Sequence, residues 1–146
     1  MSDAAPSPVC EITQDDRTMA TLAHVLQVVC WWIAPLIILL LKRDSLFVKF
    51  HALQALILQI CLAILWMAGM MVFMVAMFAT MPASGGSAHN APPPAVMIFF
   101  PVFWILGMGG WAVVLILAIV YGIKAGRGEW ADYPVIGRLA RHLLKM

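Results

Sequence analysis

The sequence predicts an all-α polytopic membrane protein with about three transmembrane helices and a carboxyl-terminal amphipathic helix. Of the 146 residues, 64% are hydrophobic and 11% are charged, which is more apolar surface than a soluble domain of this length can bury. The charged residues fall outside three long apolar stretches, at about 22–41, 50–80 and 96–123. Each stretch reaches the roughly 20 residues that a helix needs to cross a hydrocarbon core.

The first stretch leaves two topologies open. Residues 1–16 are predicted to be a disordered, Pro-containing tail, with Thr13 or Asp15 capping the helix that follows. Pro35 lies within the first apolar stretch, and because proline lacks an N–H and clashes with the preceding turn, a kink or break is expected near it. We favour a full crossing by this span. The alternative is a re-entrant hairpin that returns the amino terminus to its own side.

The second span carries a stripe of methionines. Thioethers on one helix face are potential Cu(I) ligands, but methionine also fills irregular space between helices, and no His or Cys lies at the same face and depth. The sequence also has no HxxxH, HExxH or CxxC spacing. We therefore predict no metal site. The stripe consists of Met67, Met70, Met71, Met74, Met77 and Met81.

The third span follows residues 81–95, an uncharged Gly, Ser and Pro-rich stretch that predicts a flexible linker. Ala118, Gly122 and Gly126 recur every four residues on this span. Small residues at this spacing let another helix approach closely, so they are predicted to form a helix-packing face. The whole transmembrane domain is expected to cover residues 17–126.

The carboxyl-terminal region, 127–146, is predicted to form a basic amphipathic helix that lies on the bilayer. Its Arg138, Arg141 and Lys145 would face anionic lipid head groups. With three spans, eight Lys and Arg residues fall on the side of the carboxyl terminus and only Arg17 on the other. Since cytoplasmic loops carry the excess of positive charge, we expect a cytoplasmic carboxyl terminus in a bacterial inner membrane.

Polar residues interrupt the apolar helices, where they are costly enough to need a partner or a function. His24 and Gln27 share one face of the first helix, and His51, Gln54 and Gln59 share one face of the second. They are candidates either for interhelical hydrogen bonds or for a polar path across the membrane. In a straight hairpin the two histidines would lie about 20 Å or more apart along the bilayer normal, so they would pair only if the first helix breaks.

Several short motifs, in this order and spacing, resemble a family of short bacterial membrane proteins grouped with the twenty-kilodalton inner-envelope component of the chloroplast protein-import channel. The resemblance covers about residues 18–137 and implies an all-helical inner-membrane protein with a distant link to protein translocation. After Gln54-Ala55 the sequence departs from the family, which commonly has Asn-Phe there. The motifs are Leu22-Ala23-His24, Pro35-Leu36, Phe47-Val48, His51-Ala52, Gln54-Ala55, Ala125, Gly128-Glu129-Trp130 and Tyr133-Pro134.

These features predict a non-enzymatic protein. The spans contain no acidic pair, and the sequence has no GxSxG motif or P-loop, so no catalytic residue and no cofactor are assigned. The expected partners are the lipid bilayer and another membrane protein or a second copy of the chain, and no nucleic acid. The leading hypothesis is an accessory or scaffold subunit of a membrane complex. The alternative is an oligomeric channel, transporter or translocation component lined by the His and Gln side chains.

Overall fold

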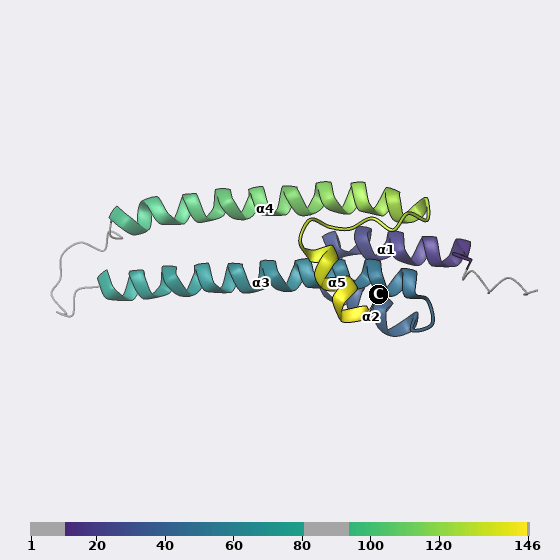
Figure 1. Ribbon diagram of the computed structural model, residues 1–146. Coiled ribbons are helices and arrows are strands. Elements are labelled where there is room, and N and C mark those ends of the chain that lie inside the picture. The colour runs from purple at the N-terminus through teal and green to yellow at the C-terminus, as the bar shows by residue number, and fades with distance from the viewer. Residues whose placement is uncertain (1–10, 81–93, 146) are drawn as a thin grey trace, which may run out of the picture.

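The computed structural model describes residues 11–80 and 94–145, and within these ranges all regular secondary structure is α-helical, without a β-strand. Two long helices run side by side, and three shorter ones gather around one half of the pair (Figure 1). The predicted linker and most of the predicted tail lie outside the described residues. In chain order the helices are α1 (Gln14–Cys30), α2 (Ile33–Leu41), α3 (Leu46–Thr80), α4 (Pro94–Gly126) and α5 (Ile136–Leu144).

Two helices, α3 and α4, are long and apolar enough to cross a membrane, over Leu46–Ala79 and Met97–Gly126. At 35 and 33 residues they measure about 50 Å, more than the roughly 30 Å of a hydrocarbon core. Their distal halves contact each other through aromatic rings, with Trp66 and Phe103 centroids 4.2 Å apart. Most of their remaining surface is exposed and apolar, as expected of helices surrounded by lipid.

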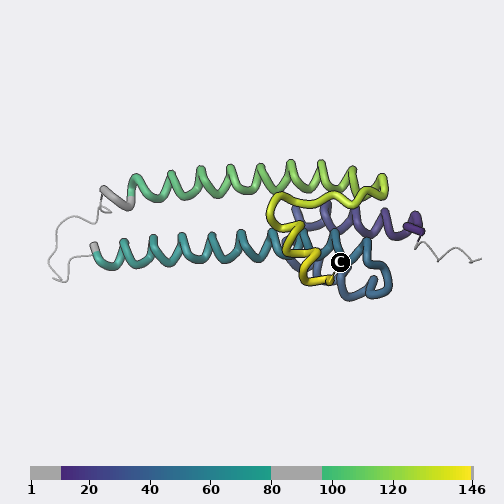
Figure 2. Tube along the Cα trace, viewed as in Figure 1, coloured from purple at the N-terminus to yellow at the C-terminus, as the bar shows by residue number. Residues whose placement is uncertain are grey.

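The expected full crossing by the first apolar stretch, and with it the three-span fold, is wrong. This stretch forms two helices, α1 and α2, separated by a turn at Trp31 and Trp32. The nine residues of α2 measure about 14 Å, less than half of a hydrocarbon core. Both helices lie beside the first half of α3 (Figure 2), so the chain enters and returns on one side, as in the alternative re-entrant arrangement.

Pro35 does not kink a continuous helix, because it lies in the first turn of α2, two residues after Ile33. The first turn of a helix has no intrahelical acceptor for its N–H groups, so proline loses no hydrogen bond there. The reversal occurs just before it, at Trp31, which adopts φ 54°. A positive φ is unfavourable for a bulky L-residue and ends α1 abruptly.

The amino end of α1 starts within the predicted tail. Thr13 caps the helix, as predicted: its hydroxyl accepts from the N–H of Asp16, while its own N–H donates to the Asp16 carboxylate. This reciprocal pair is a capping box. Residues 14–16 are therefore helical rather than part of a disordered tail.

Small residues allow the short helices to pack closely. α1 contacts both α3 and α4, and α2 and α5 contact α3. Ala23, Val48 and Ala52 form one buried cluster with Ile38 of α2, and a second cluster lies nearer the amino end of α1, where Ala20 meets α3 and α4. Methyl-sized side chains keep the helix axes close, which brings the polar side chains of α1 and α3 within hydrogen-bonding reach.

The carboxyl-terminal region is helical only over α5, not over all of 127–146. Gly128, at φ 81°, turns the chain after α4. An irregular segment, 127–135, then runs along the bundle before α5 begins. Hydrogen bonds with His51 and Gln54 of α3 hold this segment in a non-helical conformation.

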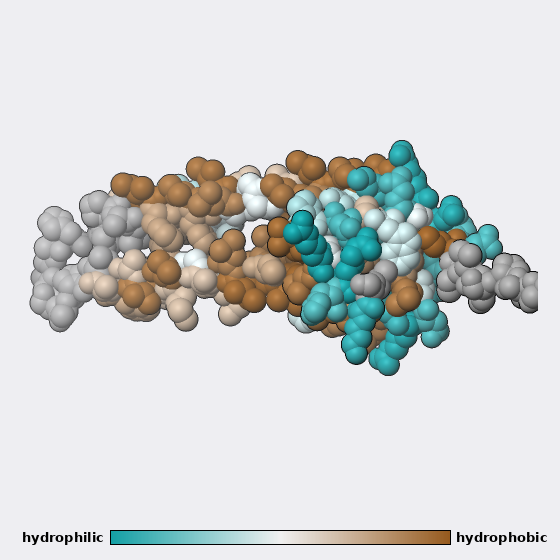
Figure 3. Space-filling view, in the orientation of Figure 1, coloured by the Kyte–Doolittle hydropathy of each residue, from teal (hydrophilic) through white to brown (hydrophobic). Residues whose placement is uncertain are grey.

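The α1–α2 hairpin and α5 lie at one end of the molecule, here called the hairpin end (Figure 1). All charged side chains of the described helices gather there, and the distal half is apolar (Figure 3). All nine Lys and Arg residues lie at this end, in α1, α5, the termini of α3 and α4, or the connections between them. The assignment of Arg17 to the opposite side of the membrane is therefore wrong. Since α1 returns as α2, Arg17 lies at the same end as the other eight.

Candidate functional site

Polar side chains lie on the inward faces of α1 and α3. His24 and Gln27 are three residues apart on α1, and His51 and Gln54 have the same spacing on α3, so each pair shares a helix face. These four side chains are fully buried, and Gln59 is 4% exposed. The predicted polar residues of both helices therefore meet inside one chain, where each needs a hydrogen-bond partner.

The two histidines form the centre of this network. Nε2 of His24 lies 3.0 Å from Nδ1 of His51, and the rings meet edge to face with their centroids 5.2 Å apart. On the other side of its ring, Nδ1 of His24 lies 2.8 Å from the hydroxyl of Tyr133. The separation of about 20 Å expected for a straight hairpin is wrong, because α1 ends at Cys30 and the chain turns back.

The segment 127–135 completes the network with its backbone. Nε2 of His51 lies 3.1 Å from the carbonyl oxygen of Glu129. The Gln54 amide donates to the carbonyl of Ala131 (3.2 Å), and its oxygen accepts from the N–H of Tyr133 (2.6 Å). Two side chains of α3 thus bind partly or fully buried backbone groups of a segment that has no regular secondary structure to pair them.

The acceptors determine where the protons lie. The Glu129 carbonyl only accepts, so Nε2 of His51 carries a hydrogen, and in a neutral ring its Nδ1 accepts from Nε2–H of His24. Nδ1 of His24 then accepts from the Tyr133 hydroxyl, whose oxygen accepts from the Gln27 amide at 3.3 Å. With both rings neutral, every ring nitrogen is used. A proton added to His24 would make Nδ1 a donor and force the Tyr133 hydroxyl to find another acceptor.

Gln59 extends the network along α3 towards the bilayer interior. Its amide donates to the backbone carbonyl of Gln27, at 3.1 Å. The side-chain oxygen of Gln27 is buried and has no hydrogen-bond partner within the described residues. A buried acceptor without a partner costs about 1–3 kcal/mol, so this end of the network is less fully satisfied than the histidine pair.

Aromatic rings surround the network on the charged side. The Phe47 ring lies 4.7 Å from that of His51 and 5.2 Å from that of Trp130. Tyr121 packs edge to face on Tyr133 at 4.3 Å. Burial raises the pKa of the Tyr133 hydroxyl, although its hydrogen bond with the Gln27 side chain acts in the opposite direction. Tyr133 is therefore a neutral donor over the physiological range.

The acidic side chains of the segment 127–135 form no hydrogen bond with the two histidines. Glu129 contributes only its backbone carbonyl, and the Asp132 carboxylate binds Arg141 at 2.9 Å. In the part of the chain that the structure describes, no three His, Cys, Asp or Glu side chains come together as a metal site. The two ring nitrogens of His24 point to different partners on opposite sides, so the histidine pair does not converge on one point.

The predicted helix-packing face is occupied by the chain itself. Ala118 is 1% exposed, and a Cβ added to Gly122 would lie 3.7 Å from Cβ of His24. Thr21 donates to the carbonyl of Gly122, at 3.2 Å. The helix that approaches Ala118 and Gly122 is therefore α1, whereas Gly126 is exposed.

The three basic residues predicted to face lipid head groups differ in their surroundings. Arg138 and Lys145 are exposed on α5. Arg141 instead forms an ion pair with Asp132 and lies over the Phe50 ring, 5.0 Å from its centroid. Contact with head groups stays a prediction for the first two, while Arg141 is engaged in docking α5.

Sequence reasoning did not identify Tyr133 as part of the site. Its neighbours in the sequence, Asp132 and Pro134, indicate a turn, and nothing in helical periodicity relates this turn to His24. One signal was available: a tyrosine in a buried position needs a partner for its hydroxyl, and the polar faces of α1 and α3 lacked one. The connection was hidden by the separation of 109 residues between His24 and Tyr133.

The chain is similar to a known protein family and to a membrane protein of known sequence. Residues 15–140 match the magnetosome magnetite crystal formation protein family. The chain is 30% identical over 125 residues to a UPF0132 membrane protein from Methanocaldococcus jannaschii. The aligned region covers 86% of this chain and 68% of that protein. No solved structure matches the chain. The resemblance to the chloroplast import-channel group is therefore wrong, because both matches point to a different membrane family.

Proposed function

Because the chain belongs to the magnetosome magnetite crystal formation protein family, we propose that it is a non-enzymatic accessory or scaffold protein of the membrane in which such crystals form. One observation carries the proposal. The polar side chains expected to serve a function in the membrane bind one another and the backbone of their own chain. These hydrogen bonds stabilise a compact hairpin beside two long apolar helices. A scaffold protein needs such a fixed structure, because it works by binding its partners and not by chemistry.

The alternative of an oligomeric channel or transporter has less support. It requires His24, His51 and Gln54 to line a path between copies of the chain. These side chains are instead fully buried within one copy, and the segment 127–135 covers them. A path would need this segment to detach, which would leave its backbone groups unpaired.

The distribution of charge supports a cytoplasmic carboxyl terminus in a bacterial inner membrane. All nine Lys and Arg residues are at the hairpin end, and cytoplasmic segments carry the excess of positive charge. Under this proposal the amino terminus lies on the cytoplasmic side too, since α1 starts at that end. The last turn of α3 and the first turn of α4 would lie on the other side, where a crystal would grow.

A scaffold needs a surface for its partner, and the distal halves of α3 and α4 provide one. The small-residue face of α4 is covered by α1, so a partner or second copy would contact the exposed apolar surface beyond the hairpin. Cys61 is exposed near the middle of α3, where this distal surface begins. In a Cys10→Ser, Cys30→Ser background, a bis-maleimide reagent in native membranes should cross-link Cys61 into a defined complex.

The matched control keeps Cys30 and carries Cys10→Ser and Cys61→Ser, because Cys30 is also exposed but belongs to the hairpin. This control should give little of the same product. A chain that remains monomeric through Cys61 at every expression level would rule out the scaffold role.

The family also predicts a phenotype. In a magnetite-forming bacterium that lacks its own members of the family, production of this protein should change the size or number of the crystals seen by electron microscopy. A variant that inserts in the membrane but fails to cross-link through the distal helices should not. Crystals identical with and without the protein would contradict a role in crystal formation.

A further inference from the structure

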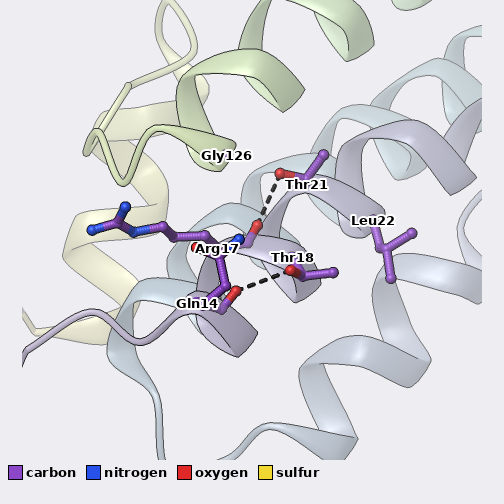
Figure 4. Close-up of a pocket in the computed structure, with 6 residues that line it drawn as sticks. All are labelled: Gln14, Arg17, Thr18, Thr21, Leu22 and Gly126. Atoms are coloured by element: carbon purple, nitrogen blue, oxygen red, sulfur yellow. Dashed lines mark hydrogen bonds between the residues drawn. The ribbon is translucent and has the colours of Figure 1, made fainter.

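Two hollows follow one another along the seam between α1 and α4. The first, of about 210 Å³, lies at the charged end of the molecule, and the second, of about 170 Å³, lies further towards the distal half. Gln14, Arg17, Thr18, Thr21, Leu22 and Gly126 line the first (Figure 4). Val25, Val28, Val29, Leu115, Ala118 and Ile119 line the second.

Helical spacing places the two hollows in line along the same seam. On α1 the lining residues recur every three or four positions, so that Leu22 of the first hollow is followed one turn later by Val25 of the second. α4 runs antiparallel to α1, and its lining residues pass from Gly126 back to Ala118 and Leu115. The two hollows, here called the α1–α4 groove, therefore lie one after the other from the charged end towards the bilayer interior, on either side of the contact between Thr21 and Gly122.

The chemistry of the groove changes along its length. One cation, one amide and two hydroxyl side chains line the first hollow, and only aliphatic side chains line the second. Its apolar part opens to the surroundings, since Val29 is 83% exposed and Ile119 is 52% exposed. From Arg17 to Val29 the helix rises about 18 Å, close to the roughly 15 Å of hydrocarbon in one leaflet.

Arg17 is a cation without an anion. Its Nε is buried and has no hydrogen-bond partner, and neither of the ion pairs among the described residues involves it. The neighbouring carboxylates are engaged elsewhere: Asp15 pairs with Lys42, and Asp16 binds Thr13. Nε itself lies against Gly128, where an added Cβ would be 3.1 Å away, so a phosphate would be bound by the terminal nitrogens of the guanidinium group. An arginine fork matches the oxygens of a phosphate group.

We propose that the α1–α4 groove binds one anionic glycerophospholipid, with its phosphate at Arg17 and one acyl chain along Val25, Val29 and Ile119. The polar end of the groove lies level with the charged end of the molecule, where head groups are found, and its apolar part lies where acyl chains are found. The bound lipid would fill the seam that holds the re-entrant hairpin against α4. This inference does not depend on the role in crystal formation.

Native mass spectrometry of the full-length protein in detergent, titrated with phosphatidylglycerol, tests the proposal. One lipid should be retained by the wild type, and phosphatidylcholine should be retained much less. Arg17→Gln should weaken retention about tenfold, the effect of losing one charge-assisted hydrogen bond, and Arg17→Lys should restore part of it. The matched control is Arg138→Gln, which removes an exposed charge of α5 and should leave retention unchanged.

Two further measurements test the apolar half without altering Arg17. Phosphatidylglycerol with long acyl chains should be retained better than a short-chain form, and Val28→Trp, which fills the second hollow, should reduce this preference. Equal retention by Arg17→Gln and the wild type would overturn the proposal. So would equal loss in Arg138→Gln, efficient displacement by inorganic phosphate, or no dependence on chain length.

Discussion

Tyr133 joins three parts of the molecule through one side chain and one backbone group. Its hydroxyl binds His24 and Gln27 of α1, and its N–H binds Gln54 of α3. All of these groups are buried. At such a position the loss of one atom leaves several partners unsatisfied, so a conservative substitution is informative.

Tyr133→Phe should lower the free energy of unfolding by about 1–3 kcal/mol, because Nδ1 of His24 loses its donor in a buried site. Thermal unfolding of the purified protein in detergent measures the change. Tyr121→Phe is the matched control: the Tyr121 hydroxyl also donates one hydrogen bond, to the carbonyl of Asp132, but in an exposed position. Equal effects of the two substitutions would argue against a stabilising network.

The same hydroxyl should make stability depend on alkaline pH. Burial raises the pKa of Tyr133 in the folded protein, whereas an unfolded tyrosine titrates near pH 10, approximately. Above about pH 10 the unfolded state therefore binds fewer protons than the folded state, and stability falls as pH rises. Thermal unfolding followed from neutral to alkaline pH should show this loss, and a smaller one in Tyr133→Phe. Parallel curves would show that Tyr133 titrates normally.

At the scale of single residues, the sequence identified which polar side chains needed partners but not which partners they have. His24, Gln27, His51, Gln54 and Gln59 stood out because a polar group in lipid is costly. The structure brings all five together. Their main partners are a tyrosine and backbone carbonyls of an irregular segment, and neither has a periodic signal that relates it to α1 or α3.

At the scale of elements, helix lengths followed from apolar composition, and helix ends followed from local chemistry only in part. Thr13 and Asp15 were both predicted as possible caps, and the capping box with Asp16 shows that Thr13 is the cap. The break between α1 and α2 was misplaced, because Pro35 is tolerated in a first turn while Trp31, an apolar residue, takes the unfavourable φ. A bulky residue with positive φ is held there by the packing around it, which the sequence does not display.

The docking of α5 depends on the absence of a side chain at Gly137. A Cβ at this position would lie 2.5 Å from Cβ of Asp132 and 2.9 Å from its Cα. Gly137→Ala should therefore push α5 away from the bundle, disturb the pair between Asp132 and Arg141, and cost about 1–3 kcal/mol. Limited proteolysis of the carboxyl-terminal region and thermal unfolding in detergent measure the two effects.

The control for this substitution is Gly110→Ala, because nothing lies within 4 Å of a Cβ added there. Alanine is the better helix former, so this change should be neutral or slightly stabilising. If both alanine variants behave alike, α5 is not docked through Gly137.

At the scale of the whole molecule, the main consequence of the hairpin is that both ends of the described chain lie on one side. α1 starts, and α4 ends, at the end that carries all nine basic residues. A three-span protein would have its termini on opposite sides. Topology therefore distinguishes the two folds directly.

Cys10 provides the measurement. In a Cys30→Ser, Cys61→Ser variant, it should be protected from a membrane-impermeant maleimide in intact cells and react once the cells are opened. A reporter fused to the carboxyl terminus should show the same protection, since both ends are expected in the cytoplasm. Labelling of Cys10 in intact cells, with a protected carboxyl-terminal reporter, would restore the three-span arrangement.

Apolar composition is enough to predict that this protein lies in a lipid bilayer and belongs to the all-α class. Long apolar stretches free of charge must lie in lipid as helices, because only helices satisfy their own backbone groups there. Two of the three stretches form helices long enough to span, and the family is a membrane family.

Whether the first stretch crosses the membrane, and what its polar residues bind, depends on how the chain packs. Apolar composition is the same for a crossing helix and for a hairpin that returns, so hydropathy does not separate them. The choice is made by contacts between distant residues, above all His24 with His51 and Tyr133. Such bonds form only when the hairpin brings both helices to one depth, and that geometry is a property of the packed chain.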